Sequence, residues 1–472
     1  GGTTEKEIRI DVFQLDVPTI SIADADKGFK VLQGSELTIT PIVDSFLETS
    51  YSWQINGEDI SNELTCTLPT IELGEYQVRF ATHNEDGDDE VTFKVEVCSP
   101  DQVDFNWTFL QTEYNMSAGR TIRIKPVDVN NALDAVYTWT VDNEQVQSGE
   151  NDTYLFTSEQ QGEHTVKVEM KNSYILATQT LKVNVCPPAG TYQRKISATS
   201  SASMNRVYEY LPAPGQFINE SHTTTTMAEA CTYAEERINQ TAYVSLGGFG
   251  GYIIVGFDHS IVNDGDYNIA ITGNAFDGSS EPGIVWVMQD ENGDGLPNDT
   301  WYELRGSEYG KAETWQDYAV TYHKPTGIQL PTPWTDNHGQ SGSIDYLGAF
   351  HRQDYYYPAW VKEKQYTLRG TRLKERNYDQ SGNGTYWVND SYEWGYADNF
   401  SAIDRLTDDD NYNAGPSDNH FKISHAVTFD GKDANLKYVD FIKVQVGVNS
   451  KSGWLGEIST EVFGIKDFNM IK

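Results

Sequence analysis

The chain has 472 residues, which at about 150 residues per domain predicts roughly three domains. It carries 34 Lys and Arg residues against 70 Asp and Glu residues, a formal net charge of −36, and so acidic a surface repels nucleic-acid phosphates and anionic lipid. Aromatic residues make up 12% of the chain, and no apolar run approaches the roughly 20 residues of a spanning helix. We therefore expect a folded protein that binds no nucleic acid.

Two copies of one repeat fill the first part of the chain. Trp53 matches Trp139 and Cys98 matches Cys186, at offsets of 86 and 88 residues. Several anchors at nearly one offset indicate a true repeat. Each copy alternates apolar and polar residues in short runs separated by turn residues, which predicts a β-sandwich of about seven strands.

The two copies, residues 1–100 and 101–187, resemble the PKD or Ig-like domains of bacterial surface proteins. That resemblance implies a spacer role, with ligand binding as the alternative. A Cys66–Cys98 bridge is one option, but Tyr154 occupies the position that corresponds to Cys66 in the second copy, which speaks against it. The start of the chain, Gly-Gly-Thr-Thr without Met, indicates a trimmed mature form.

Residues 188–204 are rich in Pro, Gly, Ser and Thr and are predicted to form a linker. Beyond it, residues 205–472 predict a third domain whose one convincing helix spans 227–240, after a Thr run that can cap it. The expected strands lie in 244–258, 267–274, 283–288, 441–446 and 461–465. So many strands beside one short helix predict an all-β chain, ending in a jelly-roll-like β-sandwich with a long insertion at about 310–430.

The run from Asp290 to Asp299 is the sharpest local motif. It alternates carboxylates and amides and has Gly295 at its sixth position, so that its oxygens can fold around one hard cation. Its twelfth position is Trp301, which departs from the EF-hand. The alternatives are a structural Ca²⁺ loop and a β-turn that satisfies its own backbone. The candidate Ca²⁺ ligands are Asp290, Asn292, Asp294, Leu296, Asn298 and Asp299.

No catalytic motif stands out in the sequence. The nine histidines lack zinc-site spacing, and the chain contains no P-loop, no dinucleotide fingerprint and no nucleophile elbow. A pair of glycosidase carboxylates cannot be singled out among 70 acids. We therefore expect a protein that is not an enzyme.

Aromatic residues beside Asn, Asp and Gly gather in the loops of the third domain. Rings provide contact area at low entropic cost and amides fix orientation, so these loops suit a ligand with apolar faces and polar edges. The alternative is that the rings pack the core of the insertion. The candidate ligand-binding residues are Trp334, His351, Tyr355, Tyr356, Trp360, Trp387, Trp394, Tyr396, Asn399 and Trp454.

Five motifs carry a more specific resemblance. They are Tyr208–Phe217, Ser245–Gly251, Gly273–Phe276, Asp299–Leu304 and Gly453–Glu461. Residues 205–472 resemble a family of Bacteroides cell-surface proteins that carry PKD-like modules ahead of a jelly-roll domain, and some members accompany corrinoid-uptake systems. The resemblance implies a monomeric, lipid-anchored protein on the bacterial outer membrane. It also implies cobalamin (vitamin B12) or a related corrinoid as ligand, and outer-membrane corrinoid transport proteins as partners.

Stacking of rings on the corrin face, with amide hydrogen bonds at its rim, suits these loops. The alternative is a histidine ligand to cobalt, with His351 and His338 as candidates. Two other functions stay open: a surface glycan-binding protein, and a carbohydrate-active enzyme. A purely structural surface protein would lack a pocket among Tyr355, Trp360, Trp387 and Trp394.

Overall fold

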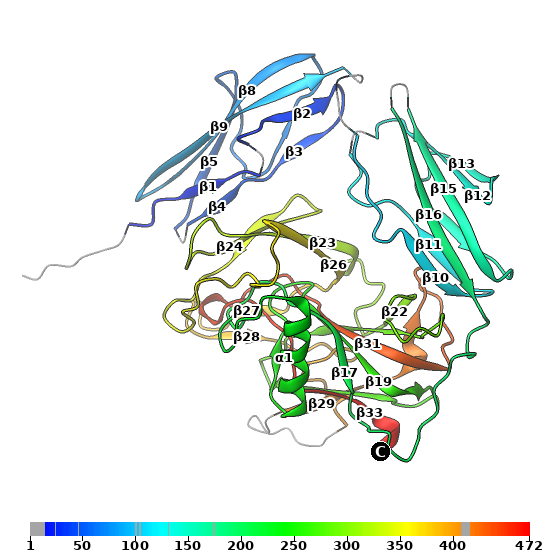
Figure 1. Cartoon of the computed structure of the whole chain (residues 1–472). Coiled ribbons are helices and arrows are strands. Elements are labelled where there is room, and N and C mark those ends of the chain that lie inside the picture. Colours follow the sequence, from blue (N-terminus) through cyan, green and yellow to red (C-terminus); the bar gives the residue numbers. More distant parts are fainter. Residues whose placement is uncertain are drawn as a thin grey trace, which may run out of the picture. The chain divides into compact units, whose positions relative to one another are not determined.

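The computed structural model describes residues 15–23, 25–45, 47–99, 102, 105–130, 132–172, 175–406 and 416–472. These residues divide into two compact units (Figure 1). The first comprises the described residues of Gly1–Val103 together with Gly339–Gly342. The second comprises the described residues of Asp104–His338 and Ser343–Lys472. The predicted start of the mature chain lies outside the described residues.

The first repeat forms a β-sandwich around Trp53. Its five-stranded sheet has the order β2-β9-β8-β5-β6, and β2 runs parallel to β9 while the other neighbours are antiparallel. Two further pairs, β1-β4 and β3-β7, complete it. The strands are β1 Thr19–Ser21, β2 Phe29–Leu32, β3 Leu37–Ile39, β4 Ile42–Asp44, β5 Ser50–Ile55, β6 Glu58–Ser61, β7 Cys66–Leu68, β8 Gly74–Asn84 and β9 Gly87–Cys98.

The second repeat has the same arrangement around Trp139, as the offset of the two tryptophans predicted. Its five-stranded sheet has the order β10-β16-β15-β12-β13, β10 runs parallel to β16, and β11 pairs with β14. The strands are β10 Glu113–Ser117, β11 Thr121–Ile124, β12 Val136–Val141, β13 Glu144–Gly149, β14 Tyr154–Thr157, β15 Gly162–Lys171 and β16 Leu176–Cys186.

The four cysteines are buried free thiols. The Cys66–Cys98 bridge, which the asymmetry of the repeat argued against, is therefore not formed. Burial raises the pKa of Cys66 and Cys98, and together with nearby Asp299 and Glu291 it raises the pKa of Cys186 to about 11. Since the thiolate is the reactive form, these side chains are inert structural groups.

Residues 206–472 build a larger two-layer β-sandwich. One layer is an antiparallel sheet of order β17-β19-β31-β21-β22-β30, and facing it are the sheet β29-β20-β33 and the pair β18-β32. Val255, Ile271 and Ile465 belong to one core that both layers share. The chain passes repeatedly from one layer to the other, as expected of a jelly-roll-like sandwich. The strands are β17 Arg206–Leu211, β18 Val244–Ser245, β19 Tyr252–Val262, β20 Ile269–Gly273, β21 Gly283–Met288, β22 Trp301–Leu304, β29 Ser417–Phe421, β30 Ala426–Val427, β31 Tyr438–Val446, β32 Glu461–Val462 and β33 Gly464–Asp467.

Helix α1, Met227–Asn239, lies beside this sandwich (Figure 1). Thr226 caps it, accepting a hydrogen bond from the N–H of Glu229, while the Glu229 carboxylate accepts one from the N–H of Thr225 at 2.8 Å. Ala234 and Ile238 face the core. The capping role of the Thr run is thus confirmed. Within the described ranges, no helix is long and apolar enough to cross a membrane.

The glycine-rich turn between β18 and β19 brings two backbone segments into contact. Gly247 has a φ of +70°, and a Cβ there would lie 2.1 Å from the carbonyl oxygen of Ala213. Only glycine fits such a close approach of two backbone segments. Short 3₁₀ turns at Ile423–His425, Gly453–Leu455 and Phe468–Met470 complete the domain.

The insertion in this sandwich contains a four-stranded sheet of order β25-β24-β23-β26 and a hairpin, β27-β28. The strands are β23 Trp315–His323, β24 Thr332–Asp336, β25 Ser341–Ile344, β26 Gln365–Arg372, β27 Asn377–Asp379 and β28 Trp387–Asn389. Two strands of the predicted insertion 310–430, β29 and β30, pair with strands of the sandwich itself and so belong to the sandwich.

The predicted linker contacts the sandwich: Arg194 donates a hydrogen bond to the buried Asp440 at 3.0 Å.

Candidate functional site

Three of the predicted ligand residues are buried and support loops. The Tyr356 hydroxyl accepts a hydrogen bond from the N–H of Leu347 and donates one to the carbonyl of His351, both at 3.0 Å. The Tyr396 hydroxyl accepts one from the N–H of Glu308 at 2.9 Å. The Asn399 amide exchanges two with the backbone of Tyr392. These three side chains therefore hold loops in place and do not offer an exposed surface to a ligand.

Two more predicted residues, Trp334 and Tyr355, pack half-buried against the core of the insertion. The ammonium group of Lys324 lies 5.8 Å from the centre of the Tyr355 ring. The backbone carbonyl of Tyr355 accepts a hydrogen bond from Asn219 at 2.9 Å. This contact ties the insertion to the loop that precedes α1.

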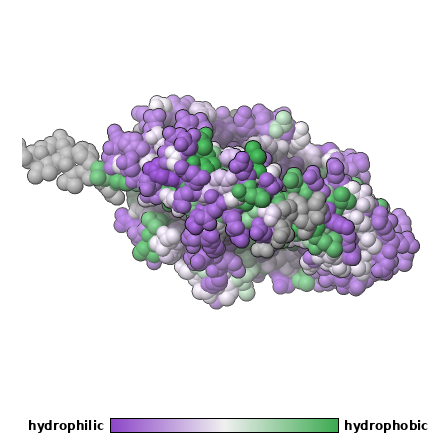
Figure 2. All heavy atoms as spheres, turned by 90° about the horizontal axis from the view of Figure 1, so that it is seen from above, coloured by the Kyte–Doolittle hydropathy of each residue, from purple (hydrophilic) through white to green (hydrophobic). Residues whose placement is uncertain are grey.

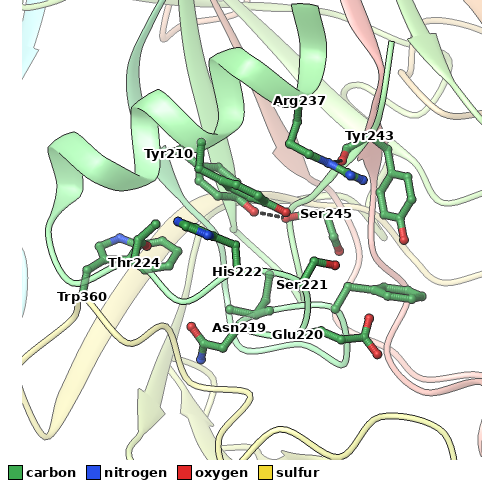
Figure 3. Close-up of a pocket in the computed structure, with 13 residues that line it drawn as sticks. Tyr210, Asn219, Glu220, Ser221, His222, Thr224, Arg237, Tyr243, Ser245 and Trp360 are labelled. Atoms are coloured by element: carbon green, nitrogen blue, oxygen red, sulfur yellow. Dashed lines mark hydrogen bonds between the residues drawn. The ribbon is translucent and has the colours of Figure 1, made fainter. Parts of the chain in front are cut away.

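Trp360 lines a narrow pocket beside α1, with about 20 Å³ of enclosed space (Figure 3). Its ring packs against Tyr210, whose hydroxyl donates to the carbonyl of Ser245 at 2.7 Å. His222 and Arg237 also line the pocket. The Trp360 indole N–H and the Thr224 hydroxyl are buried without a partner, so the pocket offers two free donors.

Both candidate cobalt ligands make contacts through their imidazole rings. His351 forms a 2.6 Å hydrogen bond with Glu220 through Nδ1 and packs its ring against Phe217. His338 is exposed and stacks on Trp315 with ring centres 4.2 Å apart. A metal binds the in-plane lone pair of a ring nitrogen, so these contacts leave cobalt ligation by either histidine open.

Trp394 lines a different pocket, of about 730 Å³. Its ring centre lies 5.1 Å from that of His425. Burial and the nearby Arg305 and Lys422 lower the pKa of His425. His425 is therefore neutral at physiological pH, and this pocket is mainly apolar.

Trp454 belongs to an exposed group of aromatic and aliphatic side chains, and Trp387 lies beside its neighbour Gly453. Trp454 is 49% exposed, Phe350 is 65% exposed and Leu455 is 41% exposed, and the Trp454 and Phe350 rings lie 6.2 Å apart. Trp387 stands against Gly453, where a Cβ would come 2.2 Å from its indole nitrogen. We refer to Phe350, Trp387, Trp454 and Leu455 as the aromatic patch.

Hydrogen bonds from several segments fix the backbone under the aromatic patch. Gln216 donates to the carbonyl of Leu455 at 2.7 Å, and Ser452 donates to the Asn389 side chain at 2.6 Å. The Glu457 carboxyl accepts from the N–H of Gln216, and burial raises its pKa to about 8. The patch is thus an exposed apolar surface on a rigid support, which is the usual form of an interaction site.

Hydrophilic residues border the aromatic patch. On the face shown in Figure 2, hydrophilic residues predominate and hydrophobic ones form small separate groups. Next to the aromatic patch, Lys451 pairs with Asp345 at 2.8 Å, and Asn377 donates to the carbonyl of Lys451 at 2.7 Å. Charged and amide groups therefore border the exposed rings.

Sequence reasoning missed a cleft of about 1780 Å³ in the second unit. The aromatic residues Trp286, Trp301 and Tyr309 line it together with Lys443. Burial lowers the pKa of Lys443 to about 8. Trp301 belongs to one of the family-like motifs, so that motif was a signal that could have drawn attention to this cleft.

The predicted Ca²⁺ loop folds on itself. The Asp290 carboxylate accepts from the N–H of Gly293 at 2.8 Å, and Asp294 accepts from the N–H of Leu296 at 2.7 Å. The Asn292 and Asn298 amides each donate to Asp294 at 2.9 Å. These contacts match the turn alternative.

Other features of the same loop favour a cation. One oxygen of Asp299 is buried without a hydrogen-bond partner, and burial beside Glu291 and Asp290 raises its pKa to about 8. Asp290 is also buried with a raised pKa. A divalent cation would relieve this repulsion, so the donor set fits Ca²⁺.

Comparison with known proteins identifies the two repeats. A family model described as a PKD-like domain matches residues 17–84 and 109–172. No curated protein sequence matches the chain significantly.

Solved structures of paired immunoglobulin-type modules align with about a third of the chain. Clostridium thermocellum CbhA fibronectin(III)-like modules align at 15% identity, covering 38% of this chain and 100% of theirs, with a TM-score of 0.19. A chimeric titin Z1Z2 aligns at 20% identity, covering 37% and 98%, with a TM-score of 0.20. The Ig1-2 module of the Drosophila receptor tyrosine phosphatase DLAR aligns at 12% identity, covering 36% and 97%, with a TM-score of 0.18. Two segments of the chain, one in each repeat, therefore match the PKD-like domain family.

Proposed function

We propose that this chain is a non-enzymatic, surface-exposed binding protein that captures cobalamin or a related corrinoid for uptake, resembling the vitamin B12-binding surface lipoprotein BtuH of Bacteroides. The observation that carries the proposal is the aromatic patch, where Trp454 and Phe350 are exposed together on a rigid support. The family-like motif Gly453–Glu461 contains Trp454 and the acceptor Glu457 that holds Gln216.

The chemistry of a corrinoid matches the patch and its rim. The corrin ring has a broad apolar face fringed by amides, so Trp454 and Phe350 would cover the face. Lys451, Asp345 and Asn377 would pair with the amides. Nanomolar affinity corresponds to about −12 kcal/mol, which a few buried rings and several hydrogen bonds can supply after the costs of association.

The remaining parts of the chain have supporting roles in this proposal. The two PKD-like modules act as spacers between a lipid anchor on the outer membrane and the binding domain. The Asp290–Asp299 loop holds a structural Ca²⁺. The captured corrinoid passes to an outer-membrane transport protein.

Calorimetric titration of the protein with cyanocobalamin, with and without EDTA, tests the proposal. We expect one-to-one binding in the nanomolar to low micromolar range. Trp454→Ala should weaken it at least about tenfold, because losing one central aromatic contact costs more than about 1.4 kcal/mol. Trp301→Ala, in the separate cleft, is the matched control and should bind normally.

Two results would contradict the proposal, each in a different way. Absence of heat and of visible-spectrum co-elution at tens of micromolar ligand would refute corrinoid capture and redirect the search to glycans, since exposed rings also stack on sugars. Normal binding by Trp454→Ala with loss in Trp301→Ala would place the ligand in the cleft instead.

A further inference from the structure

Three carboxyl groups meet at a point that no sequence motif indicated. Glu281 precedes β21, Asp398 follows the aromatic loops of the insertion, and Glu461 begins β32. One oxygen from each lies within 4.8 Å of the others. Glu281 is partly buried, whereas Asp398 is fully buried and Glu461 is 4% exposed.

Backbone N–H groups aim Asp398 at this point. Its Oδ1 accepts hydrogen bonds from the N–H groups of Asn274 and Ala275 at 2.8 and 2.9 Å. Its Oδ2 accepts one from the N–H of Glu461 at 2.9 Å. These three donors hold the Asp398 carboxyl group in place.

The Glu461 side chain supplies an independent sign of a missing partner. Its Oε1 is buried and has no hydrogen bond. Among the described residues, no Lys, Arg or His forms an ion pair with Glu281, Asp398 or Glu461. A buried oxygen without a partner costs about 1–3 kcal/mol, and more when it is charged.

Like charges in a low-dielectric site cannot all ionise without compensation. The three carboxyl groups must therefore hold either shared protons or a cation.

We propose that Glu281, Asp398 and Glu461 bind a Ca²⁺ ion, at a site separate from the Asp290–Asp299 loop. All three ligands are hard carboxylate oxygens, the donor type that Ca²⁺ prefers, and neither His nor Cys belongs to the group. The buried Glu461 Oε1 gains the partner that it lacks. The ion also replaces shared protons as the compensating charge.

The ion would connect three segments that are distant in sequence. Gly283 and Ala397 already exchange two backbone hydrogen bonds at 2.9 Å, and the N–H of Glu281 donates to the carbonyl of Asp398 at 2.9 Å. Ser280 donates through its N–H to Asn389, and Asn389 accepts from Ser452, next to the aromatic patch. Ca²⁺ at this site therefore stabilises the end of the sandwich that carries the patch.

Thermal unfolding of the whole chain tests the site without any organic ligand. After EDTA treatment and its removal, about 1 mM CaCl₂ should raise the Tm by about 5 °C over an NaCl control of equal ionic strength, as expected for an ion present at about 100 times its Kd. The double variant Glu281→Gln/Glu461→Gln should lose part of this shift, because the amides keep the volume and remove the charge, while the Asp290–Asp299 loop keeps its own Ca²⁺. Asp294→Asn, in that loop, measures the contribution of the loop, and it should keep the part of the shift that the double variant loses.

Crystals of the unaltered protein grown with Ca²⁺ give a second measurement that does not depend on how the variants fold. A Ca²⁺ anomalous peak among the three carboxylates is the expected result. Its absence would overturn the proposal, as would a Tm shift in the double variant as large as that of the unaltered protein. A shift lost only in Asp294→Asn would assign the stabilisation to the Asp290–Asp299 loop and would likewise overturn it.

Discussion

Glu303 is a buried acid on β22 that makes stability depend on pH. The Thr371 hydroxyl donates to its carboxylate at 2.5 Å, no Lys, Arg or His among the described residues pairs with it, and burial raises its pKa to about 7 from 4.5. Because folding raises the pKa, the unfolded chain ionises first as pH rises. Stability is therefore lost between these two pKa values and then stays level.

Glu303→Gln should remove this pH-dependent loss of stability. The difference in free energy of unfolding, variant minus unaltered protein, should grow by about 2 kcal/mol from about pH 5.5 to pH 8.5. Each unit of pKa shift corresponds to about 1.36 kcal/mol. Urea unfolding at both pH values measures it. A difference that is equal at both would show that Glu303 titrates normally.

The two repeat tryptophans differ in one hydrogen bond. Both are fully buried, but the Trp53 indole donates to the carbonyl of Glu63 at 2.9 Å, whereas the Trp139 indole has no partner. Trp→Phe should therefore cost about 1 kcal/mol more in the first repeat than in the second. Hydrogen exchange in β8 and β15 reports each domain separately, and equal losses would contradict the argument.

At the scale of elements, α1 depends on its first turn. Thr226→Ala removes the cap and should lower the local stability of the helix by about 1 kcal/mol, measured as faster hydrogen exchange in 227–239. Thr232→Ala is the control, because Thr232 is exposed in mid-helix and alanine favours helix formation. Equal effects of the two changes would exclude a capping role.

The same helix shows what a sequence can predict. Caps, alternating strands such as β8 and β15, and the repeat are local or periodic signals, and they were predicted correctly. Exposure in the loops was not predictable in this way. Tyr396 and Trp454 lie in similar Gly-rich surroundings, yet Tyr396 is 2% exposed and Trp454 is 49% exposed, because distant segments decide what covers each ring.

The three carboxylates of the proposed Ca²⁺ site illustrate the same limit. Glu281, Asp398 and Glu461 come from three separate parts of the chain, so no spacing in the sequence links them. The fold assembles the site by pairing the residues next to Glu281 with those next to Asp398. Only tertiary structure can reveal a group of this kind.

At the scale of the whole molecule, the net charge of −36 opposes compactness. Salt screens this repulsion but also weakens exposed ion pairs such as Arg79–Glu90 and Arg305–Asp433. Exposed pairs contribute little, about 0–1 kcal/mol each, so the repulsion should dominate. We expect the Tm to rise when NaCl increases from about 20 to 200 mM in the presence of EDTA. A fall would show that local pairs outweigh the net charge.

The parallel pairing within each PKD-like module has a mechanical consequence. β2 lies beside β9, and β10 lies beside β16, so an early strand of each module is bonded to its last strand with both running the same way. A pull on the two ends of a module loads these hydrogen bonds in shear, all at once, rather than opening them one by one. Each module should therefore resist extension until the whole pairing ruptures.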